Sequence, residues 1–403
     1  MWIGVPKSSN TYYTSQKWRG IALTTCALIL IATLILFKAK PTSPSDPEAL
    51  KGTAFFPSSI QFHPSFEFMN GTEVIWQIPN SPKAALFIAP GCTIRASNFW
   101  DKSTFCPNYD GLPEERAFVL QALEREFAVL TISSLEECWS FGKELENVEW
   151  IIKWWVRENK LEGLPMMALG ASSGGYFVSA LAFKMRFGSI TIMIAEGVFV
   201  NMAIGNDYPP TLFVHMPKDR IRMSNILRNM EDFKAKGVDV KEVRCMDFPL
   251  IPNVLSDRIP GVNRSFAVKI VEVFHEKGFV DEKGYMKMDG RATPWKEALK
   301  EKNLLSESDE WIKHVEEELN LAYGYHEFCC LKSEDIFEWF DSHMNYDLHA
   351  VRIGNIACCM RFAPEFPTRA GAAREAEYTK LPLAPQNRVT CPPPIPCRLY
   401  YYC

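Results

Sequence analysis

The chain of 403 residues lacks the patterns that mark several function classes. No repeat recurs at the periods of solenoids or propellers, which argues against those architectures. The formal net charge is only −4, so no electrostatic signal points to a nucleic acid partner. The sequence has no Walker A loop, no nucleotide fingerprint after a predicted strand and no His/Cys cluster with zinc spacing. We therefore expect no cofactor, no metal ion and no nucleic acid.

Charged side chains are also absent from residues 20–37, a run of 18 residues. At about 1.5 Å per residue, this run is near the length that crosses a hydrocarbon core of roughly 30 Å. It predicts a cytosolic tail at 1–19, a transmembrane anchor at 20–37 and a stalk at 38–55. The alternative is a cleaved signal peptide, although no good small-x-small cleavage site follows the run.

Two glycosylation sequons, at Asn70 and Asn263, favour a body that lies in the lumen. The twelve cysteines leave the compartment open, since a luminal setting would allow some of them to pair. We expect a single-pass protein of the endomembrane system (ER or Golgi) or of the cell surface, with a luminal or extracellular body.

Short apolar runs alternate with amphipathic segments in the following part of the chain, which is typical of a mostly parallel sheet with helices on both faces. This order predicts one α/β domain at residues 56–344. The predicted strands are 73–78, 83–89, 127–132, 165–169, 189–195, 211–215 and 238–245. The predicted helices are 113–126, 143–160, 224–236 and 333–340.

A Gly-x-Ser-x-Gly motif lies between the predicted strand 165–169 and a helix-like segment, with Gly170, Ser172 and Gly174 at its fixed positions. A serine at such a turn is exposed above the sheet, and the helix N-terminus behind it favours developing negative charge. The motif therefore predicts a nucleophilic serine at Ser172. Ser173 is the alternative nucleophile, but at its position the backbone N–H would serve as an oxyanion donor instead.

The strand and helix order around this motif resembles the α/β-hydrolase superfamily over roughly residues 73–343. In detail the chain is similar to the membrane-anchored, poorly characterised α/β-hydrolase-like proteins of plants. The resemblance implies a mostly parallel central sheet flanked by helices, a serine nucleophile and no cofactor. It also implies the chain order serine, then acid, then histidine for a catalytic triad.

The resemblance places the acid after the strand 211–215 and the histidine before the last helix of the domain. Asp219 and His326 occupy these places, with Glu196 as the fallback acid. Asp219 has an alternative structural role, in which it caps the next helix or pairs with Arg220 or Arg222. His326 has an alternative role as a local hydrogen-bonding residue near a helix start.

An oxyanion hole needs a second backbone N–H besides that of Ser173. The fold would supply it from the loop after the strand 83–89, where Gly91 permits close approach of the backbone. Cys92 and Thr93 are the two candidate donors. The His-Gly-Gly-Gly motif of some esterases is absent from this loop.

Asp219 and His326 are far apart in the chain, which predicts an insertion at about residues 248–320. Its helix-like pieces are 265–277, 294–302 and 306–319, the last with Ser306 and Asp309 in a spacing like that of a capping box. The insertion could act as a lid over the serine or as a cap with no gating role. Residues 345–403 show no sustained periodicity and are expected to be a poorly ordered tail.

Together these features predict a membrane-anchored serine hydrolase whose partner is a small-molecule ester or peptide substrate. Ser172 would attack a carboxylic ester, or an amide or short peptide, and form an acyl-enzyme. The alternative is a catalytically inactive α/β-hydrolase-like binding protein of the secretory pathway. The oligomeric state is left open by the sequence.

Overall fold

A computed structural model describes residues 60–200, 202, 204–306 and 309–344. They all lie in one compact unit of the chain, Phe55–Cys403. No helix in this described part is both long and apolar enough to cross a membrane. The predicted tail 1–19, anchor 20–37, stalk 38–55 and C-terminal tail 345–403 lie outside the described residues.

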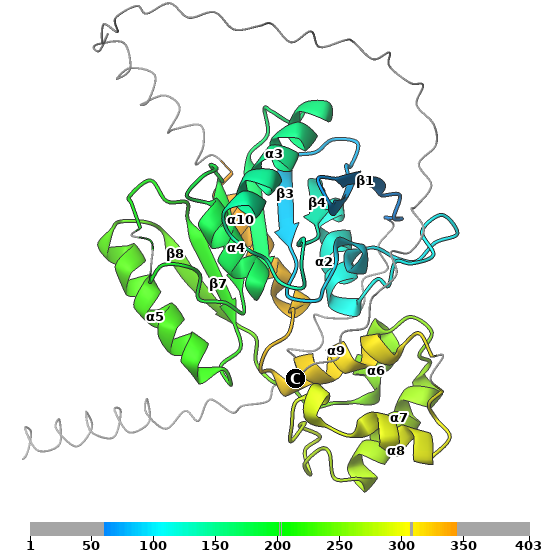
Figure 1. The fold of residues 1–403 in the computed structure, drawn as a ribbon. Helices are drawn as coiled ribbons and strands as arrows, with labels where there is room; N and C mark the ends of the chain where they lie inside the picture. Colours follow the sequence, from blue (N-terminus) through cyan, green and yellow to red (C-terminus); the bar gives the residue numbers. More distant parts are fainter. Residues whose placement is uncertain (1–59, 201, 203, 307–308, 345–403) are drawn as a thin grey trace, which may run out of the picture. The chain divides into compact units, whose positions relative to one another are not determined.

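Eight strands form one sheet in the order β1-β2-β4-β3-β5-β6-β7-β8 (Figure 1). β1 pairs antiparallel with β2, and β2 antiparallel with β4, while all other neighbours pair in parallel. The strands are β1 (Ser65–Met69), β2 (Thr72–Gln77), β3 (Ala84–Ala89), β4 (Phe127–Ile132), β5 (Met166–Ala171), β6 (Ser189–Met193), β7 (Thr211–His215) and β8 (Val240–Arg244). Strands β3 to β7 are buried throughout, because helices cover both of their faces.

The helices fall into two groups, one in the sheet domain and one in the insertion. Those of the sheet domain are η2 (Ala96–Phe99), α2 (Pro113–Glu124), α3 (Lys143–Glu158), α4 (Ser173–Leu181), α5 (Arg220–Ala235), η4 (Cys330–Lys332) and α10 (Ser333–Ser342). Those of the insertion are α6 (Pro252–Arg258), α7 (Arg264–Glu276), η3 (Gly290–Ala292), α8 (Trp295–Glu301) and α9 (Ile312–Tyr323).

Each face of the sheet is covered by helices that bury aromatic side chains. On one face Phe118 of α2 stacks on Phe337 of α10, with ring centroids 5.0 Å apart. On the other face Trp155 of α3, Phe177 of α4 and Phe233 of α5 belong to one buried core cluster. The predicted α/β class, a mostly parallel sheet between two helical layers, is therefore confirmed.

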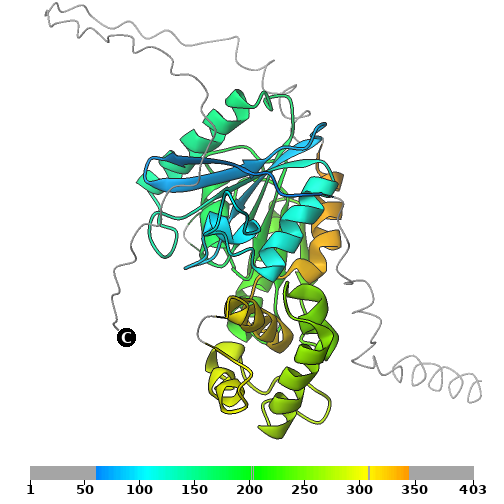
Figure 2. The same cartoon turned by 90° about the vertical axis from the view of Figure 1, so that its right-hand side faces the viewer.

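The insertion begins after β8 and ends before the loop that carries His326. Figures 1 and 2 show its helices beyond the end of the sheet at which the parallel strands finish. Arg258 of α6 forms buried ion pairs with Glu114 of the sheet domain and with Glu318 of α9. The insertion is thus tied to the body by buried charges.

Three details of the predicted elements were wrong or missing. The helix expected at 306–319 begins only at Ile312. The short helix α6 was not predicted. Neither was β1, whose residues are largely exposed and so carry little apolar signal.

We predict that Phe87→Ala lowers the free energy of unfolding by about 3–5 kcal/mol, because the side chain is fully buried in β3 and its loss leaves a cavity. Urea denaturation would measure this change. Phe105→Ala is the matched control, since Phe105 is 77% exposed and its loss should cost about 0.5 kcal/mol or less. Equal effects of the two changes would contradict the prediction.

Candidate active site

Ser172 lies on the tight turn between β5 and α4 and has a positive φ of 52°. A non-glycine residue seldom adopts this conformation, so the surrounding contacts must hold it. The N–H of Ser172 donates to the carbonyl of Met193 at the end of β6, over 2.9 Å. The side chain is thereby presented beyond the carboxyl end of the sheet, at the N-terminus of α4.

The two motif glycines make room for this turn. A Cβ atom on Gly170 would lie 2.0 Å from the carbonyl oxygen of Gly174. A Cβ atom on Gly174 would lie 2.1 Å from the carbonyl oxygen of Ala89, at the end of β3. Both distances are far below a van der Waals contact, so the residue spacing of the motif is a packing requirement.

The strand order and the tight turn at Ser172, called the nucleophile elbow, together identify the fold. An antiparallel hairpin leads into a parallel sheet, and the serine stands on a strained turn after the central strand β5. The chain has the α/β-hydrolase fold. In this fold, the loop after β7 and the loop before the last helix lie near the serine. Asp219 lies on the first of these loops and His326 on the second.

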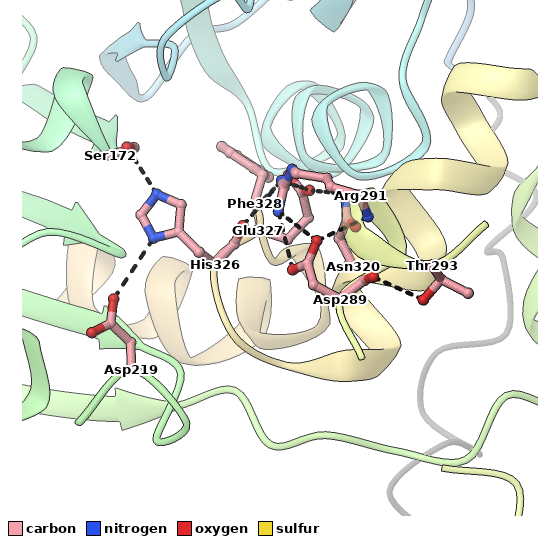
Figure 3. A network of polar contacts seen from close by, with 9 residues as sticks. All are labelled: Ser172, Asp219, Asp289, Arg291, Thr293, Asn320, His326, Glu327 and Phe328. Carbon is pink, nitrogen blue, oxygen red and sulfur yellow. Dashed lines mark hydrogen bonds and ion pairs between the residues drawn. The ribbon is translucent and has the colours of Figure 1, made fainter. Parts of the chain in front are cut away.

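His326 lies on the loop between α9 and α10 and reaches the serine (Figure 3). Its Nε2 atom is 3.0 Å from Oγ of Ser172, which is hydrogen-bonding distance. Burial and the positive charges of Arg222 and Arg291 together lower the pKa of His326 to about 4, although the carboxylates of Asp219 and Asp289 oppose the shift. The imidazole is therefore neutral near pH 7 and can accept a proton.

Asp219 has both of the structural roles considered for it, as the cap of α5 and as the partner of Arg222. Its Oδ1 atom accepts from the N–H of Arg222 and caps α5, and its Oδ2 atom lies 2.5 Å from the Arg222 guanidinium. The same Oδ2 atom is 4.0 Å from Nδ1 of His326, too far for a hydrogen bond. Nδ1 has no hydrogen-bond partner among the described residues. The structure thus brings acid and base near each other but leaves them unbonded.

The oxyanion loop, residues 90–93, runs beside the serine, and a Cβ atom on Gly91 would be 3.6 Å from Cβ of Ser172. The N–H of Thr93 already donates to the carbonyl of Glu137 over 2.6 Å, so Thr93 is not available as an oxyanion donor. The N–H of Cys92 has no acceptor among the described residues. The N–H of Ser173 is free as the first of α4, so Cys92 and Ser173 remain as the donor pair.

A neighbouring segment braces the oxyanion loop at three points. A disulfide joins Cys92 to Cys138, and Nε1 of Trp139 donates to the carbonyl of Pro90 over 2.8 Å. The third point is the Thr93 bond to Glu137. Trp139 also stacks on Phe177 of α4, with ring centroids 4.1 Å apart. The brace therefore fixes the loop relative to the helix behind the serine.

A cavity of about 1290 Å³ opens at Ser172 and extends under the insertion. Its wall contains His326 and Cys92, apolar side chains such as Phe66 and Phe328, and polar side chains from α9 such as Glu317. The volume is large enough for a substrate of drug size or more.

The remaining candidates lie outside the catalytic contacts. Glu196, the fallback acid, accepts from Asn225 and lies near Arg222, with no described contact to His326. Asn70 and Asn263 are both exposed, which agrees with the requirement for glycosylation but does not test it. Among the described residues, no cluster of three His, Cys, Asp or Glu side chains could hold a metal ion.

Comparisons with known proteins found similar solved structures, while no protein-family model and no curated protein matches. A thermostable esterase is 13% identical with a TM-score of 0.35, over 47% of this chain and 56% of that one. The chain thus spans little more than half of that esterase's length. An esterase/lipase from an uncultured bacterium is 13% identical with a TM-score of 0.35, over 62% of this chain and 97% of that one. A carboxyl esterase from Bacillus coagulans is 9% identical with a TM-score of 0.35, over 47% of this chain and 91% of that one.

Sequence reasoning missed three features of the site. Arg291 and Glu327 contact the histidine loop, but Arg291 lies 35 positions before His326 and carries no local motif. The pairing of Cys92 with Cys138 could not be chosen from twelve cysteines. Glu327 was detectable only as the neighbour of a candidate histidine.

We predict that Gly174→Ala destabilises the protein by about 1–3 kcal/mol, because the added methyl group would collide with the backbone of β3. Gly163→Ala is the matched control, since a Cβ atom there meets nothing within 4 Å. Thermal unfolding of both variants would check this. A Gly174→Ala protein as stable as the control would contradict the close approach.

We predict that His326 titrates with a pKa near 4, because burial and two arginines disfavour its charged form. An NMR titration of the histidine Hε1 resonances, assigned with His326→Gln, would measure it. Any reaction that needs His326 as a base should then be lost only as the pH falls through about 4. A midpoint near the usual 6.5 would contradict the burial argument.

Proposed function

We propose that the chain is a serine hydrolase that cleaves a carboxylic ester, with an amide or short peptide as the second substrate class. The observation that carries this proposal is the 3.0 Å contact between Oγ of Ser172 and Nε2 of His326 at the strained elbow. A neutral histidine beside a half-buried serine that borders a cavity is the arrangement that activates a weak nucleophile. The esterases among the similar structures are consistent with this chemistry.

In the proposed reaction, Oγ of Ser172 attacks the ester carbonyl while Nε2 of His326 takes the serine proton. The N–H groups of Cys92 and Ser173 hold the oxyanion of the tetrahedral intermediate. His326 returns the proton to the leaving alcohol as the C–O bond breaks, which yields the acyl-enzyme. A water molecule, deprotonated by the same histidine, then attacks the acyl carbonyl. The bond between that carbon and Oγ of Ser172 breaks, His326 returns the proton to Oγ, and the carboxylic acid leaves.

Asp219 is the proposed orienting carboxylate. Its separation of 4.0 Å from Nδ1 of His326 is looser than in a working triad, and such contacts often tighten when substrate binds. A small rotation of the imidazole or of the carboxylate would close the gap. Asp219 would then be shared between His326 and Arg222.

The pairing of Asp219 with Arg222 also favours a second candidate function. If the guanidinium holds the carboxylate permanently, the histidine lacks its orienting partner and catalysis would be weak. The chain would then be an α/β-hydrolase-like protein of the secretory pathway that binds a small ligand in the cavity at Ser172.

Anchoring by residues 20–37 and a luminal or extracellular body remain part of the proposal. Two disulfides in the described part, Cys92–Cys138 and Cys245–Cys329, support an oxidising compartment. Glycosylation of Asn70 and Asn263, both exposed, would be expected in such a compartment. The closer resemblance to membrane-anchored plant proteins likewise stays a prediction.

We predict that a fluorophosphonate probe labels the full-length protein and that Ser172→Ala abolishes labelling, because the probe reacts only with an activated serine. Mass spectrometry of the labelled peptide would identify the modified residue. Ser173→Ala tests the other serine of the motif, whose side chain is not needed for its backbone N–H. Labelling retained in Ser172→Ala but lost in Ser173→Ala would assign the nucleophile to Ser173. A folded wild-type protein that stays unlabelled would favour the binding protein.

A further inference from the structure

We propose that Arg291, a residue of the insertion, is a positioning residue that holds the His326 loop for catalysis. The insertion would then be a part of the active site and not only a cover above it. This inference rests on the proposed serine hydrolase function, because it assigns His326 as the base.

Arg291 bonds to the histidine loop at two places (Figure 3). Its Nη2 atom donates to the main-chain carbonyl of His326 over 3.2 Å. The same atom forms an ion pair with Oε2 of Glu327 at 2.5 Å. One guanidinium therefore restrains the backbone of the base and the side chain of the next residue.

Glu327 collects a second contact from the insertion. Its Oε2 atom also accepts from Nδ2 of Asn320 on α9 over 2.8 Å, and its Oε1 atom accepts from the N–H of Phe328. The side chain of Glu327 is only 14% exposed, whereas that of Arg291 is 47% exposed, so the bonds to Asn320 and Phe328 are the more shielded of its contacts. Two elements of the insertion, η3 and α9, thus converge on the residue that follows the histidine.

Arg291 is itself held in place. Asp289 accepts from the N–H of Arg291 and lies 3.2 Å from its Nη1 atom. η3 packs closely on α9, since a Cβ atom on Gly290 would lie 2.8 Å from Cβ of Leu319. The contacts form one continuous path from α9 through η3 to His326. Movement of η3 away from the body would have to break both bonds to the histidine loop.

Arg291 also acts on the base through its charge. Four charged side chains act on the pKa of His326: Arg222 and Arg291 lower it, and Asp219 and Asp289 raise it. Burial raises the pKa of Glu327, the next residue, to about 7, although the charge of Arg291 opposes this shift. Removal of the Arg291 charge should therefore raise the pKa of His326. This shift separates a positioning residue beside the base from a residue that only stabilises the insertion.

The test compares Arg291→Met and Arg291→Lys with Arg264→Met in the full-length protein. Arg264 is an exposed residue of α7 with no described ion pair, which makes it a matched control. The rate of fluorophosphonate labelling is measured against probe concentration and pH, and thermal unfolding confirms folding.

For Arg291→Met we expect the maximal labelling rate to fall about 10- to 100-fold, with little change in the half-saturating probe concentration, because a misplaced base slows only the chemical step. The acidic limb of the pH profile should move to higher pH. Arg291→Lys should keep the acidic limb near its wild-type position, since the charge remains, but recover the rate only in part. Arg264→Met should match the wild type.

Wild-type labelling rates and pH profiles in Arg291→Met would overturn the inference while leaving the serine hydrolase standing. No labelling of the wild-type protein would instead overturn the proposed function and this inference with it. If Arg291→Met does not fold, Glu327→Gln offers a second reading, since it removes the ion pair while keeping the side-chain shape. An unchanged rate in a folded Glu327→Gln protein would also count against the positioning role.

Discussion

The site depends on one strained residue. Ser172 has a φ of 52°, and the chain tolerates this because the carbonyl of Met193 accepts its N–H and two glycines let β3, β5 and α4 approach one another. The same approach brings the oxyanion loop alongside the serine. A single turn therefore sets both the position of the proposed nucleophile Ser172 and its distance from the proposed oxyanion donors.

The sequence predicted those parts of the molecule that follow from local pattern. The buried strands β3 to β7 carry continuous apolar runs. Ser172, Asp219 and His326 were chosen instead from the chain order of the family that the chain resembles, and their catalytic roles stay predictions. Contacts between distant segments were not predictable. The N–H of Thr93 donates to the carbonyl of Glu137, 44 positions away, and the guanidinium of Arg291 donates to the carbonyl of His326, 35 positions away.

The junction between the body and the insertion contains more carboxyl groups than cations. Arg258 is paired with both Glu114 and Glu318. Burial raises the pKa of Glu115, and burial together with the nearby charge of Glu115 raises that of Glu317 well above its usual range. Buried carboxyl groups without a cation are tolerated when they keep a proton. The insertion is thus joined to the body by a few polar contacts whose geometry must be kept, and the path through Arg291 is one of them.

The disulfide between Cys92 and Cys138 turns part of the body into a covalent ring. Its two ends are 46 positions apart, and the ring contains η2, α2 and β4. In a chain-entropy model, a ring of this size disfavours the unfolded state by about 4 kcal/mol. The oxyanion loop sits at the closure point, so it cannot fray away from its brace while the ring remains intact. The N–H of Cys92 could therefore leave its place beside Ser172 only if the disulfide were reduced or if the ring of η2, α2 and β4 opened as a whole.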